Sequence, residues 1–208
     1  KNEGNVLRAL ECSGIALRYD EFADRYLVEG LEGYGPILSD HALDEMYLLI
    51  QREYCFKPSK DDFDRVVLAH ARRLRFHPVK DYLATLEWDG IERIDDWLIR
   101  YGGADDDAFT RAVGRIVLIA AIRRIYQPGV KFDEMLVIEG LQGTLKSTAI
   151  AALSPRPEWV TDSLSLSAEE RVIIEQTAGK WLAEIGELSG YRKREVEHIK
   201  AFLSRQTD

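Results

Sequence analysis

The spacing of apolar residues in the first third of the chain predicts a small unit of strands and helices. Two short apolar, β-prone runs at 15–19 and 25–28 flank a polar turn, which is the pattern of a β-hairpin. A helix is expected from a Ser39 cap to about Tyr54, because apolar residues recur on one face. A second helix is expected from about Asp61, with acidic residues first and arginines last, the order that complements a helix dipole.

Proline and acidic residues organise the middle of the chain. The pair His77-Pro78 begins a new segment, because proline disfavours helix in the preceding residue and fits the first turn of the next helix. A short helix is expected over about 93–101. A long helix follows the acidic cluster 105–107, and its centre at 117–122 is apolar nearly all the way round, which predicts burial on most sides.

After residue 130 the pattern changes to that of a parallel sheet. Residues 135–138 form a short apolar run without polar alternation, as expected of a strand covered on both faces. Further strands are expected at 159–161 and 181–185, with a helix at 168–176 between them. The order βαβαβ favours a three-layer αβα fold built on a parallel sheet.

Composition limits which partners the chain can bind and which cellular compartment suits it. With 208 residues and 46% hydrophobic residues, the chain can bury a real core, and its net charge of −8 means that any nucleic-acid contact is local. Its two cysteines, Cys12 and Cys55, are too few for a disulfide framework, so we expect a cytoplasmic protein. No apolar run approaches the ~18 residues of a membrane helix, and no membrane partner is expected.

The candidate chemistry begins at a glycine-rich turn between the 135–138 run and the helix that follows it. Strand, glycine loop and helix form the context of a phosphate-binding loop, where backbone N–H groups and the helix dipole hold a polyphosphate. We expect Lys146 to reach the β and γ oxygens of ATP and Ser147 to place its hydroxyl on Mg²⁺. The expected nucleotide-binding residues are Gly140, Gln142, Gly143, Thr144, Leu145, Lys146, Ser147 and Thr148.

One position departs from the usual loop pattern G-x-x-x-x-G-K-[ST]. Leu145 stands where the second glycine is expected, and its Cβ restricts the backbone and narrows the route to the phosphates. The alternative interpretation is an ordinary strand-turn-helix joint with a solvated lysine.

The loop completes the predicted domain organisation of an α/β protein. A small N-terminal α+β unit is expected at 1–76, and a helical segment at 77–130 packs on the core. A P-loop NTPase core is expected at 131–208. Because the chain opens without Met and stops in mid-pattern, we expect this core to be incomplete at its C-terminus and the chain to be a piece of a longer protein.

Hydrolysis also requires a carboxylate near Mg²⁺ and one that orients or deprotonates the attacking water. We assign Glu184 to the outer shell of the metal and Glu187 to the water, although these two roles could be exchanged. Together with Lys146 they form the predicted catalytic set. The alternative is that Glu187 caps the next turn and Glu184 is a surface carboxylate.

The last segment, 191–208, concentrates basic residues in an otherwise acidic protein. Local charge of this kind can bind a phosphate backbone. Glu195 and Glu197 interrupt the positive charge, so a solvated helix face is the alternative. The candidate nucleic-acid contacts are Arg192, Lys193, Arg194, Lys200 and Arg205.

Several stretches from about Phe76 to the end of the chain carry a more specific likeness than the loop alone. They are 77–79, 82–83, 88–90, 126–129, 140–148, 159–164, 179–188 and 199–208. In this order they resemble the virulence-associated E family, P-loop proteins of prophages and mobile islands that look like superfamily 3 replicative helicases. The resemblance implies an ATPase with ATP and Mg²⁺ as cofactors.

The resemblance also implies partners. Such ATPases assemble as homo-oligomeric rings on single-stranded DNA, often beside a primase, and separate strands at a replication origin. Lys200, Ser204 and Arg205 fall where these helicases place the element before their DNA-contacting hairpin. That hairpin, the polar sensor and the arginine that completes a neighbour's site are not in this sequence, so binding of nucleotide without turnover stays open for this chain.

Two other functions remain open on the sequence. A small-molecule kinase could use the same loop, together with a basic acceptor pocket and a lid. Alternatively, Leu145 marks a lapsed site in a replication assembly module that binds DNA or protein without hydrolysing nucleotide.

Overall fold

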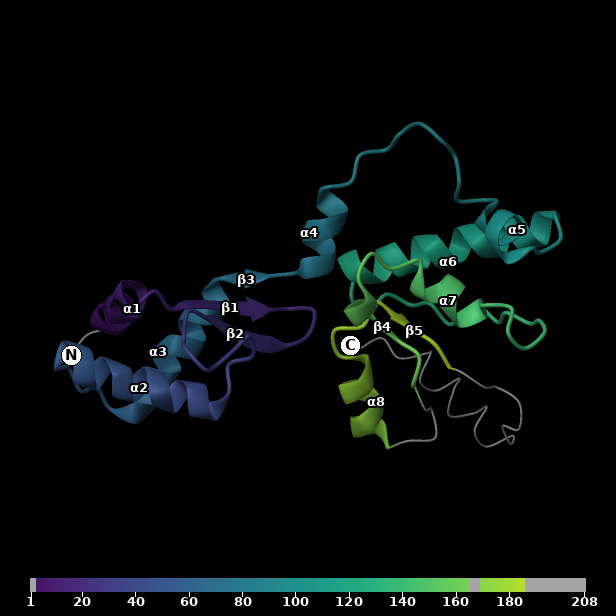
Figure 1. The fold of residues 1–208 in the computed structure, drawn as a ribbon. Coiled ribbons are helices and arrows are strands. Elements are labelled where there is room, and N and C mark those ends of the chain that lie inside the picture. The colour runs from purple at the N-terminus through teal and green to yellow at the C-terminus, as the bar shows by residue number, and fades with distance from the viewer. Residues whose placement is uncertain (1–2, 165–168, 186–208) are drawn as a thin grey trace. The chain divides into compact units, whose positions relative to one another are not determined.

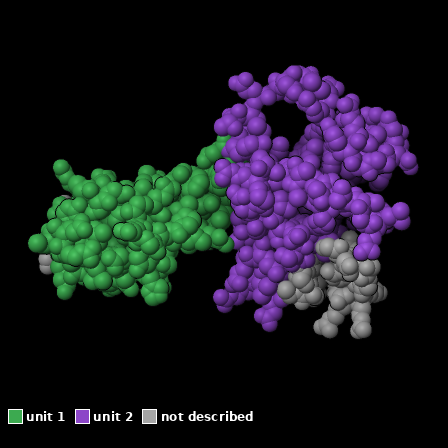
Figure 2. Space-filling model, in the orientation of Figure 1, with its two compact units in different colours: residues 1–81 green, residues 82–208 purple. Residues whose placement is uncertain are grey.

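The computed structural model describes residues 3–164 and 169–185. The chain divides into two compact units, residues 1–81 (unit 1) and 82–208 (unit 2), which Figure 2 shows in different colours. Each unit contains its own small β-sheet, so the protein is of mixed α/β class. Within the described ranges, no helix is long and apolar enough to cross a membrane.

In unit 1 a hairpin and a short third strand form one sheet (Figure 1). The middle strand pairs antiparallel with the second strand and parallel with the third, which gives the order β2-β1-β3. Asp20 fixes the hairpin turn, because its carboxylate accepts the backbone N–H groups of Phe22 and Ala23. The elements are α1 (Glu3–Cys12), β1 (Ala16–Asp20), β2 (Arg25–Glu29), α2 (Asp40–Tyr54), α3 (Lys60–Arg73) and β3 (Arg75–Phe76).

Serine caps start both long helices of unit 1. The Ser39 hydroxyl accepts the N–H of Ala42 at 3.2 Å, and the Ser59 hydroxyl accepts the N–H of Asp62 at the same distance. Each cap satisfies one backbone donor that has no partner inside its helix. The predicted hairpin and these two helices are confirmed, whereas α1 had no clear signal in the sequence.

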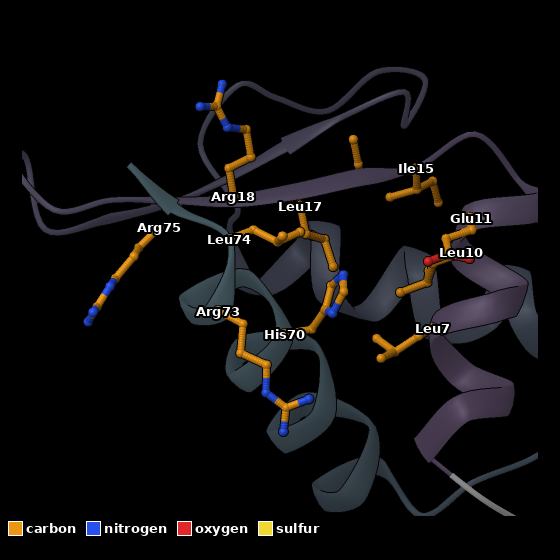
Figure 3. Close-up of a pocket in the computed structure, with 11 residues that line it drawn as sticks. Leu7, Leu10, Glu11, Ile15, Leu17, Arg18, His70, Arg73, Leu74 and Arg75 are labelled. Atoms are coloured by element: carbon orange, nitrogen blue, oxygen red, sulfur yellow. The ribbon is translucent and has the colours of Figure 1, made fainter. Parts of the chain in front are cut away.

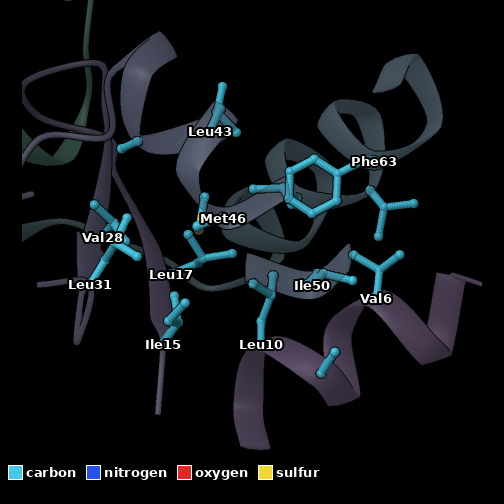
Figure 4. Packing of buried hydrophobic residues seen from close by; sticks show 14 of the residues in the cluster. Val6, Leu10, Ile15, Leu17, Val28, Leu31, Leu43, Met46, Ile50 and Phe63 are labelled. Atoms are coloured by element: carbon cyan, nitrogen blue, oxygen red, sulfur yellow. The ribbon is translucent and has the colours of Figure 1, made fainter. Parts of the chain in front are cut away.

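Alternate strand residues and one face of each helix build the core of unit 1 (Figure 4). Leu17 and Val28 lie opposite each other in the hairpin and are 3% and 1% exposed. Met46 and Ile50 of α2 and Phe63 of α3 are completely buried against them. Each such side chain contributes about 1.5–3 kcal/mol on burial, so this cluster is the main stabilising feature of the unit.

Two helices of unit 2 pack through a tryptophan and a glycine. The indole Nε1 of Trp97, in α5 (Trp97–Gly102), donates to the carbonyl oxygen of Gly114, in α6 (Ala108–Tyr126), at 3.0 Å. A Cβ on Gly114 would lie 3.0 Å from that same nitrogen, so a larger residue would push the helices apart. Asp107 caps α6 by accepting a backbone N–H of its first turn.

The expectation that the centre of α6 is buried on most sides is wrong. Ile116 and Ile119 are each 49% exposed, and Ile122 is 42% exposed. The indoles of Trp97 and Trp181 hydrogen-bond to one side of this helix, and the exposed isoleucines lie outside that contact. An apolar circumference predicts burial only where other elements exist to cover it.

A parallel βαβ arrangement lies at the end of the described chain. β4 (Val160–Thr161) pairs in parallel with β5 (Leu182–Ala183), and α8 (Glu170–Thr177) connects them. The short helices η1 (Pro157–Trp159) and α7 (Lys146–Ala151) precede these strands. The two later strands and the helix between them were expected from the sequence, although both strands are shorter than expected. The remaining helix, α4 (Pro78–Ala84), contains the division between the two units.

The strand expected at 135–138 is wrong, because the structure has no strand between residues 131 and 145. A parallel strand requires a hydrogen-bonded neighbour and cover on both faces, yet no described strand pairs with this run and Val137 is 52% exposed. The mixed α/β class is confirmed. The three-layer P-loop NTPase core is not shown by the described residues, whose parallel sheet in unit 2 has two strands.

Candidate functional site

The glycine-rich loop 140–145 is a tight turn that leads directly into α7. Gly143 has φ 83°, and Leu145, the residue before the helix, has φ 59° and ψ 29°. The turn is closed by Thr144, whose Oγ1 donates to the carbonyl oxygen of Leu141 at 2.8 Å. Two residues in the left-handed region reverse the chain so that the loop curls over the start of the helix.

The Lys146 side chain folds back over this loop. Its Nζ donates to the carbonyl oxygens of Gly140 at 3.0 Å and Leu141 at 2.9 Å, and it lies 3.4 Å from Thr144 Oγ1. All three acceptors are neutral, and Lys146 forms no ion pair with a carboxylate of the described residues. Its positive charge is therefore held at the loop without being neutralised there.

The loop also presents unused backbone donors. No N–H group from Gln142 to Ser147 donates a hydrogen bond to a residue within the described ranges. The first N–H groups of any helix lack partners inside it, and the helix dipole adds partial positive charge at the same end. Unused donors, a dipole and an ammonium group on one turn are features that favour an anion. Every predicted nucleotide-binding residue from Gly140 to Thr148 lies on this turn or in the first residues of α7.

Leu145 occupies the glycine position without filling the turn. Its side chain is 69% exposed, so it projects into solvent. Its backbone adopts the left-handed conformation that the loop requires. For a leucine this conformation costs roughly 1–2 kcal/mol. The loop therefore keeps a glycine-like shape at a cost in stability.

The hydroxyl of Ser147 and the carboxylate of Glu184 lie side by side. Ser147 Oγ donates to Glu184 Oε1 at 2.6 Å, although 37 positions separate the two residues in the sequence. Both residues were predicted to serve the same Mg²⁺. No group of three or more His, Cys, Asp or Glu side chains that could hold a metal occurs in the part of the chain that the structure describes. A hydroxyl with one carboxylate nevertheless fits Mg²⁺, which keeps several waters and takes its other ligands from phosphates.

The parallel strands position Glu184. Its backbone N–H donates to the carbonyl oxygen of Thr161 at 2.7 Å, directly after β5. At the other end of β5, the N–H of Trp181 donates to Trp159 at 2.6 Å, and its indole donates to the carbonyl oxygen of Ala121 in α6 at 2.9 Å. The two tryptophan rings meet edge-on with centroids 6.2 Å apart. No spacing rule singled out these tryptophans as positioning residues; only their places at the start of the two expected strands hinted at it.

The other predicted site residues lie outside the described residues. They are Glu187, Arg192, Lys193, Arg194, Lys200 and Arg205. The water-orienting role of Glu187 and the DNA contacts of the basic residues therefore stay predictions.

Unit 1 contains a hollow of about 620 Å³ between α1, β1 and the end of α3 (Figure 3). Buried leucines such as Leu10 and Leu17 form part of its lining. Figure 3 shows that the side chains of Arg18, Arg73 and Arg75 leave the hollow in three directions. Because their guanidinium groups do not converge, the hollow offers no compact anion site, and we assign it no ligand.

The fold and the loop define a mixed α/β protein with a glycine-rich turn, a lysine and a hydroxyl–carboxylate pair. The sequence model of the virulence-associated protein E-like domain matches residues 83–208. This match covers more than half of the chain, and the chain belongs to that family. Membership suggests a protein associated with a phage or another mobile element. A comparison with curated proteins gave no match.

Replacing Leu145 by glycine is expected to stabilise unit 2. Leu145→Gly removes the cost of a left-handed leucine, and we expect the free energy of unfolding to rise by roughly 0.5–1 kcal/mol. Urea unfolding followed by tryptophan fluorescence measures the change, because Trp97 and Trp159 are buried in this unit.

Leu141→Gly is the matched control. Leu141 lies in the same loop, is 82% exposed and has no positive φ. Glycine at this position relieves no unfavourable backbone conformation. It is expected to lower the free energy of unfolding by roughly 0.5–1 kcal/mol, because it raises the entropy of the unfolded chain. Equal changes for both variants would show that the conformation of Leu145 carries no special cost.

Proposed function

We propose that the protein binds ATP and Mg²⁺ at residues 140–148 and hydrolyses ATP as a helicase-type P-loop ATPase in phage or mobile-element DNA replication. The observation that carries this proposal is the hydrogen bond from Ser147 to Glu184. In P-loop NTPases, the hydroxyl that follows the loop lysine and a carboxylate from a neighbouring strand share one Mg²⁺. Here the loop supplies the first group and β5 leads to the second.

Each residue of the site has a separate task in this proposal. Lys146 exchanges the carbonyl oxygens of Gly140 and Leu141 for the β and γ oxygens of ATP, which are charged and bind the ammonium more strongly. Ser147 and Glu184 hold Mg²⁺ from one side. The bound ion neutralises charge on the phosphate oxygens. Glu187 is assigned to the attacking water.

Family membership supports the proposed partners. They are single-stranded DNA, a primase, and further copies of the protein in a ring. The proposed DNA contacts are the basic residues between Arg192 and Arg205, which give local positive charge to a chain whose net charge is −8.

Lys146→Ala is expected to weaken ATP binding by about 10- to 100-fold, because it removes a charged donor to the phosphates. Isothermal titration calorimetry with ATP and Mg²⁺ gives the dissociation constants of both proteins. Lys131→Ala is the control, since Lys131 is an exposed lysine of the same unit whose partner is Asp133. If ATP binds equally well to both variants, or not at all to the wild type, nucleotide binding at this loop is excluded.

A double-mutant cycle tests the metal pair. Ser147→Ala and Glu184→Gln should each lower ATP affinity in the presence of Mg²⁺, and the double variant should lose less than the sum of the two, because both groups act on one ion. When EDTA removes Mg²⁺, the effects of the two substitutions should become additive. Ser154→Ala, which removes an exposed hydroxyl bonded to Arg156, serves as the control. Strict additivity with Mg²⁺ would mean that the two residues do not share a metal.

DNA dependence separates a helicase-type ATPase from other P-loop enzymes. Single-stranded oligothymidylate is expected to raise the steady-state rate of phosphate release several-fold, and Lys146→Ala should abolish both the basal and the stimulated rate. A coupled phosphate assay measures these rates. A rate that DNA leaves unchanged would rule out the helicase type, and phosphoryl transfer to a metabolite would favour a kinase.

A further inference from the structure

An acidic residue outside the predicted site set lies at the carboxyl end of β4. Asp162 directly follows Thr161, the last residue of this strand, and it is exposed. Among the described residues, no hydrogen bond or ion pair engages its carboxylate. In α/β proteins ligands bind outside the carboxyl ends of parallel strands, so the charge of Asp162 is placed where a ligand can meet it.

The strand register places Asp162 next to Glu184. β4 and β5 lie side by side and run in parallel, with Thr161 paired with Ala183 (Figure 1). The residue after each of these partners is an acid. The N–H of Glu184 donates to the carbonyl oxygen of Thr161 at 2.7 Å, which holds the two backbones together at this point. Neighbouring strands lie about 5 Å apart, so one hydrated ion can reach both carboxylates.

The neighbours of Asp162 in the chain fix the side to which its carboxylate is directed. Thr161 is buried, and its Oγ1 lies 3.3 Å from Ser163 Oγ. The two hydroxyls therefore lie on one side of the chain. Because successive side chains of an extended chain alternate between its two sides, Asp162 is directed to the opposite side. Glu184 has the same place relative to Ala183, so the register puts both carboxylates on one side.

The same edge of the sheet holds the hydroxyl–carboxylate pair of the candidate site. Ser147 Oγ donates to Glu184 Oε1 at 2.6 Å, and Asp162 adds a second carboxylate beside that pair. Proteins bind Mg²⁺ through one or two carboxylates together with phosphates of the substrate, and the ion keeps several waters. Waters on the ion donate hydrogen bonds to nearby carboxylates. Such charge-assisted bonds are stronger than bonds between neutral groups.

We propose that Asp162 is a further positioning residue of this site, which holds waters of the Mg²⁺ bound by Ser147 and Glu184. The inference rests on the proposed function, because it assigns another carboxylate to the same metal. Hydrogen bonds from the waters to two carboxylates, rather than one, orient the water shell and raise the affinity of the site for the ion. Glu187 keeps its assignment to the attacking water, so Asp162 has a separate task.

Isothermal titration calorimetry with ATP, in Mg²⁺ and in EDTA, tests this role. The readout is the factor by which Mg²⁺ tightens ATP binding, because a merely structural change would weaken binding in both conditions alike. Asp162→Asn keeps the size of the side chain and removes its charge. It is expected to lower this factor about tenfold, the usual cost of losing a group that supports metal ligands. Asp162→Glu, which keeps the charge, should recover part of the loss.

A second experiment uses a metal alone and needs no nucleotide. Mn²⁺ takes the same oxygen ligands as Mg²⁺, and its electron paramagnetic resonance signal gives the concentration of free ion. The wild type is expected to bind Mn²⁺ with a dissociation constant of about 0.1–1 mM, as weak oxygen-ligand sites do. Asp162→Asn and Glu184→Gln should each weaken binding about tenfold. Glu158→Gln is the control, since Glu158 precedes β4 at its other end and pairs with Arg156. Circular dichroism confirms that each variant is folded.

The two experiments separate this inference from the proposed function. If Mg²⁺ tightens ATP binding equally in the wild type and in Asp162→Asn, the nucleotide site stands and the role of Asp162 is excluded. If the wild type binds no ATP, nucleotide binding fails and the Mn²⁺ measurement decides the role of Asp162. In that case Mn²⁺ binding that both acid substitutions weaken supports the shared metal site. A wild type without Mn²⁺ binding, or equal Mn²⁺ binding in Asp162→Asn, overturns it.

Discussion

The short hydrogen bond between the Ser147 hydroxyl and the Glu184 carboxylate is the constraint on which the candidate site depends. It joins the first turn of a helix to the residue that follows a strand, and so it fixes the loop relative to the sheet. A bond to an ionised acceptor is stronger than one between neutral groups. It exists only because β4 and β5 pair in parallel and direct the end of β5 towards α7. The pairing of β4 with β5 therefore also sets the geometry of the candidate site.

Local signals in the sequence predicted local structure well. Ser39 and Asp107 mark helix starts because capping involves residues only three positions apart. The closeness of Ser147 and Glu184 was also predictable, since phosphate-loop chemistry requires a hydroxyl after the lysine and an acid at a strand end. Residues 135–138 show the limit of this reasoning. An apolar run indicates a tendency to be buried, but whether it becomes a strand depends on neighbours distant in the sequence.

The same limit explains the outer side of α6. Its apolar sequence predicted burial, and the described chain covers only part of its circumference. Leu145 presents the opposite case, because a leucine in place of a glycine suggested a blocked loop. The backbone nevertheless adopts the required conformation and the side chain turns outward. The backbone conformation of one residue depends on all the interactions within its turn, and residue type alone does not reveal these.

The indole of Trp181 links a helix of unit 2 to the candidate site. It bonds the backbone of α6 to the start of the strand that ends at Glu184. Two strand residues separate Trp181 from Glu184, and both are paired with β4, so the backbone links the position of α6 to that of the carboxylate. The spacing between Ser147 and Glu184 is therefore set in part by a helix that contributes no residue to the candidate site.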